Sequence, residues 1–407
     1  MYNIKKLTFS DYLQWFFIYC MVGYNGMTIP LGLSYEIFQV FMFTICSFII
    51  YFHKRQYPQL INSIFYFCCV LFIVQFLIML VTPLTLGTVL SSIITFEVIY
   101  ATYLLNSHQF LTRVTKFVAL IAGLSLIIYI MTYILGFHEM VRFFSPISKV
   151  SYAAHTGDIY GWNIYVYNFV LVHQDRNCGP FGEPGQYQCI LAATLFFLLF
   201  YKTNFSKKNK SYLILLIVTT LITTQSTTGY FSLIIIFTTY ILYSSFLIKS
   251  DYYLRRTFKW MIVICAIFLI FTDIGNSFYE RTISNKIDYQ NQEIKSSGLA
   301  RVISIKEAIE WISSTPTVLI GNGYDEVLTK VRSESGLLVY LLAVGILPFS
   351  ILYGFLTKIS FVYSPRTFIA ISKILILINM SLGQPHILNP SLFLIILYPY
   401  IQKKSLL

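Results

Sequence analysis

The chain has 407 residues, of which 57% are hydrophobic and only 11% are charged, and its mean hydropathy is +0.69. An ordinary globular surface needs about a quarter of its residues charged, so this composition excludes a soluble globular protein and indicates an integral membrane protein. Apolar runs of about 17 to 24 residues recur along the chain, which is the length of a membrane-spanning helix and about twice that of a barrel strand.

We therefore expect an all-α fold in a single integral membrane domain, residues 1–407, with about twelve transmembrane helices. The expected spans lie near 12–30, 33–51, 60–81, 84–105, 114–136, 186–201, 211–225, 229–248, 258–274, 335–356, 367–381 and 388–401. Two longer segments, 137–185 and 275–334, interrupt this series, and the other connections are short turns. Function is expected in these two segments.

Basic residues fall in every second connection of this series. They are Lys5, Lys6, Lys54, Arg55, Arg113, Lys116, Lys202, Lys207, Lys208, Lys210, the group from Lys249 to Lys259, Lys358, Arg366, Lys373, Lys403 and Lys404. Lys and Arg in short loops are retained on the cytoplasmic side, so the pattern predicts two cytoplasmic termini and places 137–185 and 275–334 outside. The net charge of +12 then reflects topology, and we expect no nucleic-acid partner.

The sequence contains no signature of nucleotide or metal chemistry. It has no GxxxxGK[ST] loop and no cytosolic domain, so a substrate would have to arrive already activated. No CxxC or HExxH spacing is present, and we expect neither a metal site nor a cofactor. Outside the cytoplasmic membrane, the natural activated donors are lipid-linked diphosphates that move in the bilayer.

The stretch RNCGPFGEPGQYQ, residues 176–188, directly precedes a wholly apolar run. Its glycines and prolines predict a structured, non-helical approach to the next span, and glycine lets the backbone come close to a ligand. Pro184 is typical of a helix start, which places Glu183 at a helix N-terminus, seven residues after Arg176. The same residues also fit a simple re-entry turn, whose acid caps the helix and whose arginine reaches the lipid headgroups.

Three blocks resemble bacterial O-antigen polymerases of the Wzy type and the wider O-antigen ligase and polymerase superfamily. The first is the pattern Arg-x-x-Gly-x-Phe-x-Glu-Pro-Gly, residues 176–185, and the second is TTLITTQSTTGY, residues 219–230, which is similar to a Thr-x-Ser-x-x-Gly element between consecutive helices. The third block consists of Ser297, Gly298, Arg301, Trp311, Pro316, Gly321, Asn322 and Gly323. Related ligases usually carry a His-Asn pair where this chain has Ser333-Glu334-Ser335, which favours a polymerase.

The resemblance implies a GT-C-like multi-pass glycosyltransferase in the bacterial cytoplasmic membrane. It would transfer a growing glycan from undecaprenyl diphosphate to a lipid-linked repeat unit, with a flippase and a chain-length regulator as partners. In this interpretation Arg176 and Arg301 bind the diphosphate, and Glu183 is the general base. The glycines and proline of the first block, Gly179, Gly182, Pro184 and Gly185, would shape the backbone around them.

The segment RVISIKEAIEWIS, residues 301–313, predicts an amphipathic helix in the second external segment. Val302, Ile305, Ile309 and Ile312 recur at helical spacing and would form its apolar stripe. Such a stripe fits a membrane surface and also fits packing on top of the bundle.

Glu97 lies in the middle of an expected span and has two interpretations. It marks a functional site, or it is hydrogen bonded to a polar side chain of a neighbouring helix.

Two other functions remain open from the residues. A lipid-linked oligosaccharide flippase or another transporter would be equally rich in membrane helices, but transporters favour inverted repeats and helices broken at mid-membrane. The chain shows no evident repeat, and both long segments are expected on one face. An O-antigen ligase would use the same lipid-linked donor with a different acceptor.

Overall fold

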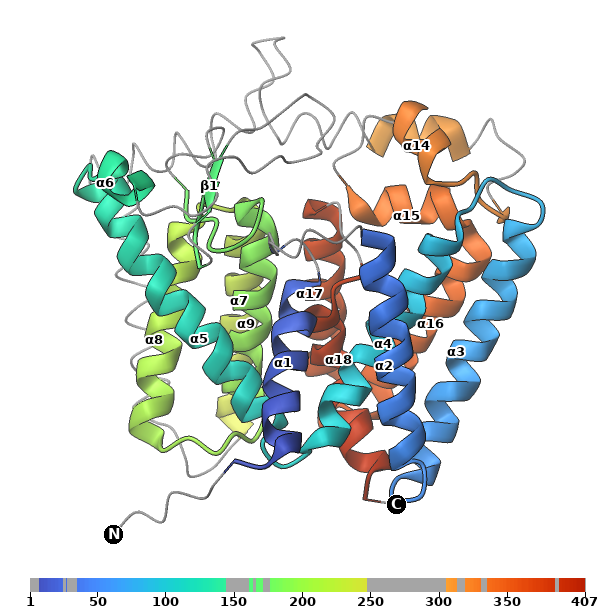
Figure 1. Cartoon of the computed structure of the whole chain (residues 1–407), viewed down its shortest axis with the longest axis horizontal. Helices are drawn as coiled ribbons and strands as arrows, with labels where there is room; N and C mark the ends of the chain where they lie inside the picture. Colours follow the sequence, from blue (N-terminus) through green and yellow to red (C-terminus); the bar gives the residue numbers. More distant parts are fainter. Residues whose placement is uncertain are drawn as a thin grey trace.

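The computed structural model describes residues 7–24, 27, 35–143, 161–163, 166–170, 176–246, 305–312, 319–330, 335–384 and 388–406. In these residues the chain is almost entirely helical, and most helices run side by side in one bundle (Figure 1). The expected span 258–274 and Arg301 lie outside the described residues.

The helices follow the order that the sequence predicts. In the first part of the chain they are α1 (Phe9–Gly23), α2 (Tyr35–His53), α3 (Pro58–Met79), α4 (Leu86–Leu105), α5 (Phe110–Tyr129), the π-helical turn η1 (Ile130–Ile134) and α6 (His138–Phe143). The short strands β1 (Gly161–Asn163) and β2 (Asn168–Val170) form an antiparallel pair. The second part contains α7 (Pro184–Phe200), α8 (Lys207–Thr223), α9 (Thr227–Phe246), a helix at 305–312, α14 (Tyr324–Lys330), α15 (Gly336–Val344), α16 (Ile346–Val362), α17 (Thr367–Gly383) and α18 (Pro390–Lys404).

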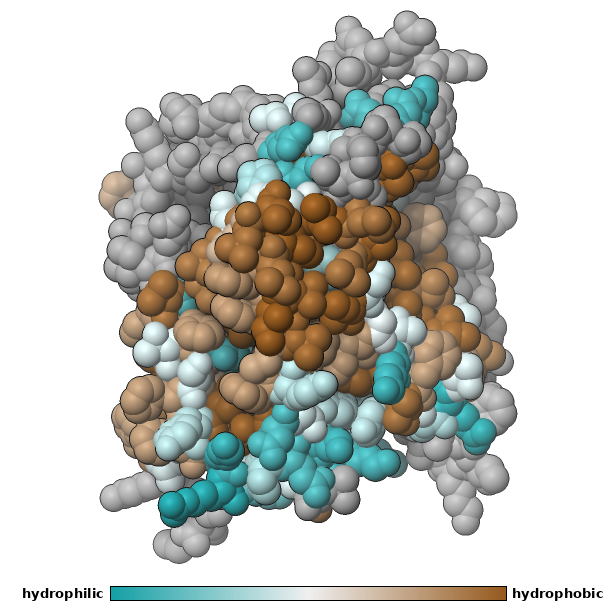
Figure 2. All heavy atoms as spheres, turned by 90° about the vertical axis from the view of Figure 1, so that its right-hand side faces the viewer, coloured by the Kyte–Doolittle hydropathy of each residue, from teal (hydrophilic) through white to brown (hydrophobic). Residues whose placement is uncertain are grey.

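Four stretches of the described helices are long and apolar enough to cross a membrane: Pro58–Met79, Leu86–Leu105, Phe110–Ile134 and Thr227–Ser244. The outer surface agrees with this, because α3 exposes large apolar side chains such as Phe65, Tyr66, Ile73, Leu77 and Leu80. Figure 2 shows a broad apolar area on this side of the molecule, with hydrophilic residues gathered below it. A surface of this kind requires an apolar environment, and an all-α, membrane-embedded protein is confirmed.

The bundle has two distinct ends (Figure 1). Helices α7, α9 and α15 begin at one end, which we call the motif end because it carries residues 176–185, whereas α18 begins inside the bundle, where the Leu388 carbonyl accepts from Thr95 Oγ1 in the middle of α4. Helix α1 begins and α18 finishes at the opposite end, where Ser10 Oγ donates to the Leu105 carbonyl (2.7 Å) and the Tyr103 and Ser405 hydroxyls are 2.8 Å apart. The two termini of the helical bundle therefore lie on the same side.

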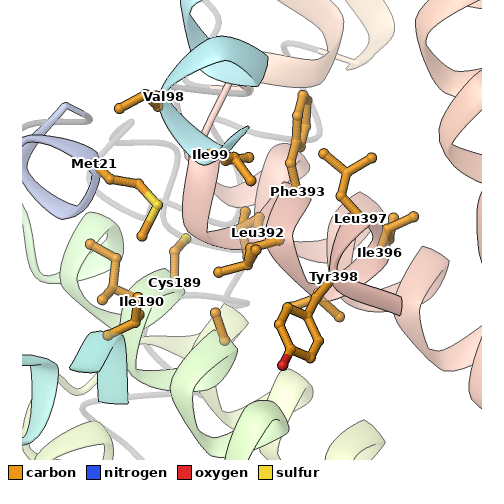
Figure 3. Close-up of a cluster of buried hydrophobic side chains, with 14 of the residues drawn as sticks. Met21, Val98, Ile99, Cys189, Ile190, Leu392, Phe393, Ile396, Leu397 and Tyr398 are labelled. Carbon is orange, nitrogen blue, oxygen red and sulfur yellow. The ribbon is translucent and has the colours of Figure 1, made fainter. Parts of the chain in front are cut away.

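Helices α7 and α18 form the centre of the bundle. Every residue of α7 from Pro184 to Leu199 is buried, as expected for a helix that carries no charge and is apolar around its whole circumference. It packs between α5, α8, α9 and α18. Figure 3 shows how side chains from four helices interdigitate here, among them Met21 of α1, Ile99 of α4, Ile190 of α7 and Phe393 of α18.

The prediction of one span at 335–356 is wrong, because the chain forms two helices there. Helix α15 has nine residues, about 14 Å at 1.5 Å per residue, which is too short to cross a bilayer. It stops at Gly345, where φ is +90°, and α16 begins at the next residue. A Cβ at Gly345 would lie 2.5 Å from the Gly321 backbone nitrogen, so close packing against residue 321 requires glycine.

Arg113 does not lie in a basic loop as the charge pattern predicts. It belongs to the first turn of α5 and is buried, with Nη2 donating to Asp11 Oδ1 at 2.6 Å and Nη1 donating to Gln14 Oε1 at 2.6 Å. Gln14 Nε2 in turn donates to the Thr102 carbonyl at 2.8 Å. The arginine therefore joins α1, α4 and α5 through a buried polar network.

Lys373 also does not lie in a loop, where the charge pattern predicts it. It lies in the second turn of α17 with 1% of its surface exposed, and its Nζ has no hydrogen-bond partner among the described residues. The ammonium lies 5.6 Å from the centre of the Tyr201 ring, within reach of a cation–π interaction.

Candidate functional site

Residues 176–183 form a turn that leads into α7 at the motif end. Helix α7 begins at Pro184, as the sequence predicts, and Glu183 occupies the N-cap position with φ −136° and ψ 143°. The Glu183 carbonyl accepts from the Gln186 and Tyr187 backbone N–H groups. Within the described residues, the Glu183 carboxylate makes no side-chain capping hydrogen bond, so the interpretation of this acid as a simple helix cap is not supported.

The first two sequence blocks, far apart in the chain, are in direct contact. Arg176 Nε donates to the Thr224 carbonyl at 3.0 Å, which fixes the guanidinium at the turn between α8 and α9. Asn177 makes a double contact with Thr223: its backbone N–H donates to the carbonyl at 2.9 Å, and its Nδ2 donates to Oγ1 at 3.0 Å. The arginine of the first block is thus held by the threonine-rich second block.

The turn itself is rigid because its glycine is closely packed. Gly179 has φ +52°, and a Cβ there would lie 2.6 Å from the Tyr187 ring, so any other residue would clash. Its N–H donates to Asn177 Oδ1 at 3.0 Å. The Tyr187 hydroxyl lies 2.8 Å from Ser125 Oγ, which ties the first turn of α7 to α5.

The pair of strands β1 and β2 holds the turn from the other side. Asn168 of β2 donates from its backbone N–H to the Gly179 carbonyl at 2.6 Å. Tyr167, the residue before it, is buried, and burial raises the pKa of its hydroxyl far above the usual range. This hydroxyl therefore stays protonated beside the turn and is not a candidate base.

Below the turn, three helices meet through glycines, each of which is in contact with a polar side chain of another helix. These residues are Gly185 with Gln384, Gly229 with Gln188, and Gly383 with Thr228, and we call them the glycine junction. A Cβ at Gly229 would lie 2.6 Å from Gln188 Oε1, and Cβ atoms at Gly185 and Gly383 would overlap their partners. A larger residue at Gly383 would meet the branched Thr228 side chain, and one at Gly185 or Gly229 would displace the amide end of a glutamine, so the glycines favour this close approach of α7, α9 and α17.

Hydrogen bonds connect the glycine junction to its neighbours. Gln188 Nε2 donates to Thr228 Oγ1 at 2.7 Å, and Asn379 Nδ2 donates to the Thr228 carbonyl at 2.8 Å. The Gly336 backbone N–H, at the start of α15, donates to the Gln384 carbonyl at 2.8 Å. The junction thus links α7, α9, α15 and α17 directly beneath residues 176–183.

The electrostatics of this end favour a bound anion. Three helices, α7, α9 and α15, begin here, and each N-terminus carries a partial positive charge and backbone N–H groups outside the intrahelical ladder. Arg176 adds a full positive charge. Glu183, at the α7 N-terminus, supplies a carboxylate that could accept a proton. The arrangement can hold an anionic group beside a base.

The described residues of the third block are joined to α15, whose first residue lies at the motif end. The Asn322 and Gly323 backbone N–H groups each donate at 3.0 Å, to the carbonyls of Leu342 and Ala343 in the last turn of α15. The opposite end of α15 begins beside Gln384. Because Arg301 lies outside the described residues, its position relative to Arg176 stays a prediction.

The helix at 305–312 is present, and of its predicted apolar stripe Ile312 packs against the molecule, whereas Val302 lies outside the described residues. Ile305 and Ile309 are exposed, Ile309 by 59%, whereas Ala308 and Trp311 are buried. The buried pair packs in a small cluster with residues of α14 and α15, among them Val327, Val339, Leu342 and Ala343. The helix therefore rests on α15 through a small and a large side chain, a pairing that the isoleucine spacing alone did not indicate.

Glu97 makes the hydrogen bond to a neighbouring helix that one of its two interpretations predicts: Ser47 Oγ of α2 donates to Glu97 Oε1 of α4 at 3.2 Å. Its Oε2 is buried and has no partner among the described residues, so a functional role for this acid stays a prediction. The glutamines at the site, Gln186, Gln188 and Gln384, were not predicted from the sequence. The available signal was two glutamines at alternate positions in the first turns of an otherwise apolar helix.

Substituting Gly185 by alanine is expected to destabilise the protein by about 1 kcal/mol, because the added methyl displaces the amide end of the Gln384 side chain from its contact with α7. Thermal unfolding in detergent would measure this. Gly354→Ala in α16 is the matched control: among the described residues nothing lies within 4 Å of its Cβ position, so alanine there should be neutral or stabilising. Equal melting temperatures for Gly185→Ala and wild type would contradict the glycine junction.

No protein-family model matches the chain, and neither a curated protein nor a solved structure matches it.

Proposed function

We propose that the chain is a membrane glycosyltransferase that polymerises undecaprenyl-diphosphate-linked oligosaccharide repeat units into O-antigen or capsule-type polysaccharide. The observation that carries this proposal is the contact between the two sequence blocks, Arg176 Nε on the Thr224 carbonyl and Asn177 on Thr223. Residues that resemble the polymerases in two separate segments meet at one end of the bundle. That end combines an arginine, an acid and the N-termini of α7, α9 and α15.

The proposal includes a topology of about twelve spans in the bacterial cytoplasmic membrane, with both termini in the cytoplasm. The exposed basic residues Lys54, Arg55, Lys207 and Arg366 lie in or beside the turns at the end opposite the motif end, which supports this orientation. The motif end would then face outward, where lipid-linked repeat units are delivered by a flippase. A chain-length regulator is the other proposed partner.

In the proposed reaction, a hydroxyl of the acceptor repeat unit attacks the anomeric carbon of the donor glycan. The bond from that carbon to the diphosphate oxygen breaks, and the electron pair leaves with undecaprenyl diphosphate. Glu183 accepts the hydroxyl proton, and Arg176 stabilises the negative charge of the leaving group, assisted by Arg301. A single displacement of this kind inverts the configuration at the anomeric carbon.

A strain that lacks this protein is expected to retain single lipid-linked repeat units on the outer face of the membrane and to lose all long chains. Gel separation of surface glycan and extraction of the lipid-linked pool would show both effects. Accumulation of single units on the cytoplasmic face would instead indicate a flippase. Long chains that remain on undecaprenyl diphosphate and fail to reach their final anchor would indicate a ligase.

A further inference from the structure

Three buried glutamines at the motif end have polar atoms without hydrogen-bond partners in the described part of the chain. Gln186 is 2% exposed, and neither Oε1 nor Nε2 has a partner. Gln188 is fully buried and Gln384 is 5% exposed, and in both the carbonyl oxygen Oε1 lacks a partner. Leaving such groups unpaired costs about 1–3 kcal/mol each, so a cluster of them calls for an explanation.

The segments that carry the three glutamines are close to one another and to the proposed reaction site. Gln384 is in contact with Gly185, the residue immediately before Gln186. Gln188 is joined to Thr228, which is in contact with Gly383, the neighbour of Gln384. All three lie within the first two turns of α7 or at the end of α17, directly below the turn that carries Arg176 and Glu183.

The chemistry of the unpaired atoms indicates what they bind. Three of the four are carbonyl oxygens, which accept hydrogen bonds, and one is an amide nitrogen, which donates. A phosphate has only acceptor oxygens at neutral pH and could satisfy only the single donor. A sugar presents several hydroxyls, each of which both donates and accepts, and an acetamido group offers one of each.

We propose that Gln186, Gln188 and Gln384 bind the sugar that is attached directly to the lipid diphosphate, through its hydroxyl or acetamido groups. This rests on the proposed polymerase function and deepens it, because it separates sugar recognition from diphosphate binding. The arginine and the helix N-termini hold the diphosphate, and the glutamines select the uncharged sugar. Their position at the base of the turn allows both contacts to one ligand.

The test compares two probes on the purified full-length protein in detergent. The first is undecaprenyl diphosphate, and the second is the lipid-linked repeat unit extracted from the native host after deletion of the gene. Wild-type protein is expected to bind the repeat unit more tightly than the bare lipid. Gln186→Met, which keeps the side chain's length and removes its polar atoms, should weaken binding of the repeat unit about tenfold and leave binding of undecaprenyl diphosphate unchanged.

Gln75→Met is the matched control. Gln75 is a fully buried glutamine of α3 that also has an unpaired Oε1, but it lies in another network, with Ser92 and Tyr340. The Gln75→Met variant should bind both probes with the wild-type affinity. Gln188→Met provides a second variant if Gln186→Met does not yield folded protein, as judged by its melting temperature.

The outcomes separate this inference from the proposed function. If wild type and Gln186→Met bind both probes equally, the glutamines are structural, and the inference is overturned while the polymerase proposal stands. If wild-type protein binds neither probe, or if the deletion strain contains no lipid-linked repeat unit, the proposed function fails and the inference fails with it. A selective loss of repeat-unit binding supports both.

Discussion

Replacing Arg176 by lysine is expected to reduce polymer about a hundredfold while the protein remains in the membrane at its normal level. A guanidinium can donate from Nε to the Thr224 carbonyl and from its terminal nitrogens to two phosphate oxygens. A lysine ammonium is a single point charge and cannot occupy both positions. Removing a contact to developing charge typically costs about 3 kcal/mol, on the order of a hundredfold in rate.

Polymer length and amount on a gel, with a membrane blot for expression, would measure the effect of Arg176→Lys. Arg55→Lys is the control, since Arg55 is exposed in the turn at the opposite end and should tolerate the change. Wild-type polymer from Arg176→Lys would assign Arg176 a purely structural role at the α8–α9 turn. A lower melting temperature without loss of turnover by the remaining folded protein would lead to the same conclusion.

Glu183→Gln is expected to abolish polymer without loss of folded protein. The amide keeps the shape of the side chain but cannot accept the proton of the attacking hydroxyl. Stability should change little, because an amide oxygen accepts hydrogen bonds as a carboxylate oxygen does and could cap the helix equally well.

Activity in membranes and the melting temperature of the purified variant would be measured side by side. Glu310→Gln is the control, because Glu310 is an exposed acid of the 305–312 helix that is paired only loosely with Lys306, at 3.9 Å. Normal polymer from Glu183→Gln would remove Glu183 from the reaction. Glu334 would then be the next base to test.

The membrane class, the helix order and the start of α7 could be predicted because they depend on local signals. Hydropathy identifies an apolar helix from its own residues, and a proline that follows an N-cap acid marks a helix start without reference to the rest of the fold. The break at Gly345 could not be predicted in this way. The residues on both sides are equally apolar, and the break depends on close packing against Gly321, which is a tertiary contact.

The sequence indicated candidate residues for the site, but it did not indicate the contacts that hold them in place. The resemblance of residues 176–185 indicated Arg176 and Glu183 as candidates, yet nothing local indicated that Thr224 would hold the arginine. The same applies to Arg113, which counted as a loop cation until the structure showed its pairing with Asp11, 102 residues away. Buried polar contacts between distant segments leave no periodicity in the sequence, and so the glutamines of the motif end were missed.

Lys373 has a consequence for how the chain enters the membrane. On the proposed topology α17 crosses the bilayer, and a lysine near the middle of a lone helix opposes its release from the translocon by about 2.5–3.5 kcal/mol. In the folded bundle that lysine is shielded by its neighbours and lies beside the Tyr201 ring at the end of α7. Insertion of α17 should therefore depend on helices made before it, so that the C-terminal helices partition into lipid as a group and not one by one.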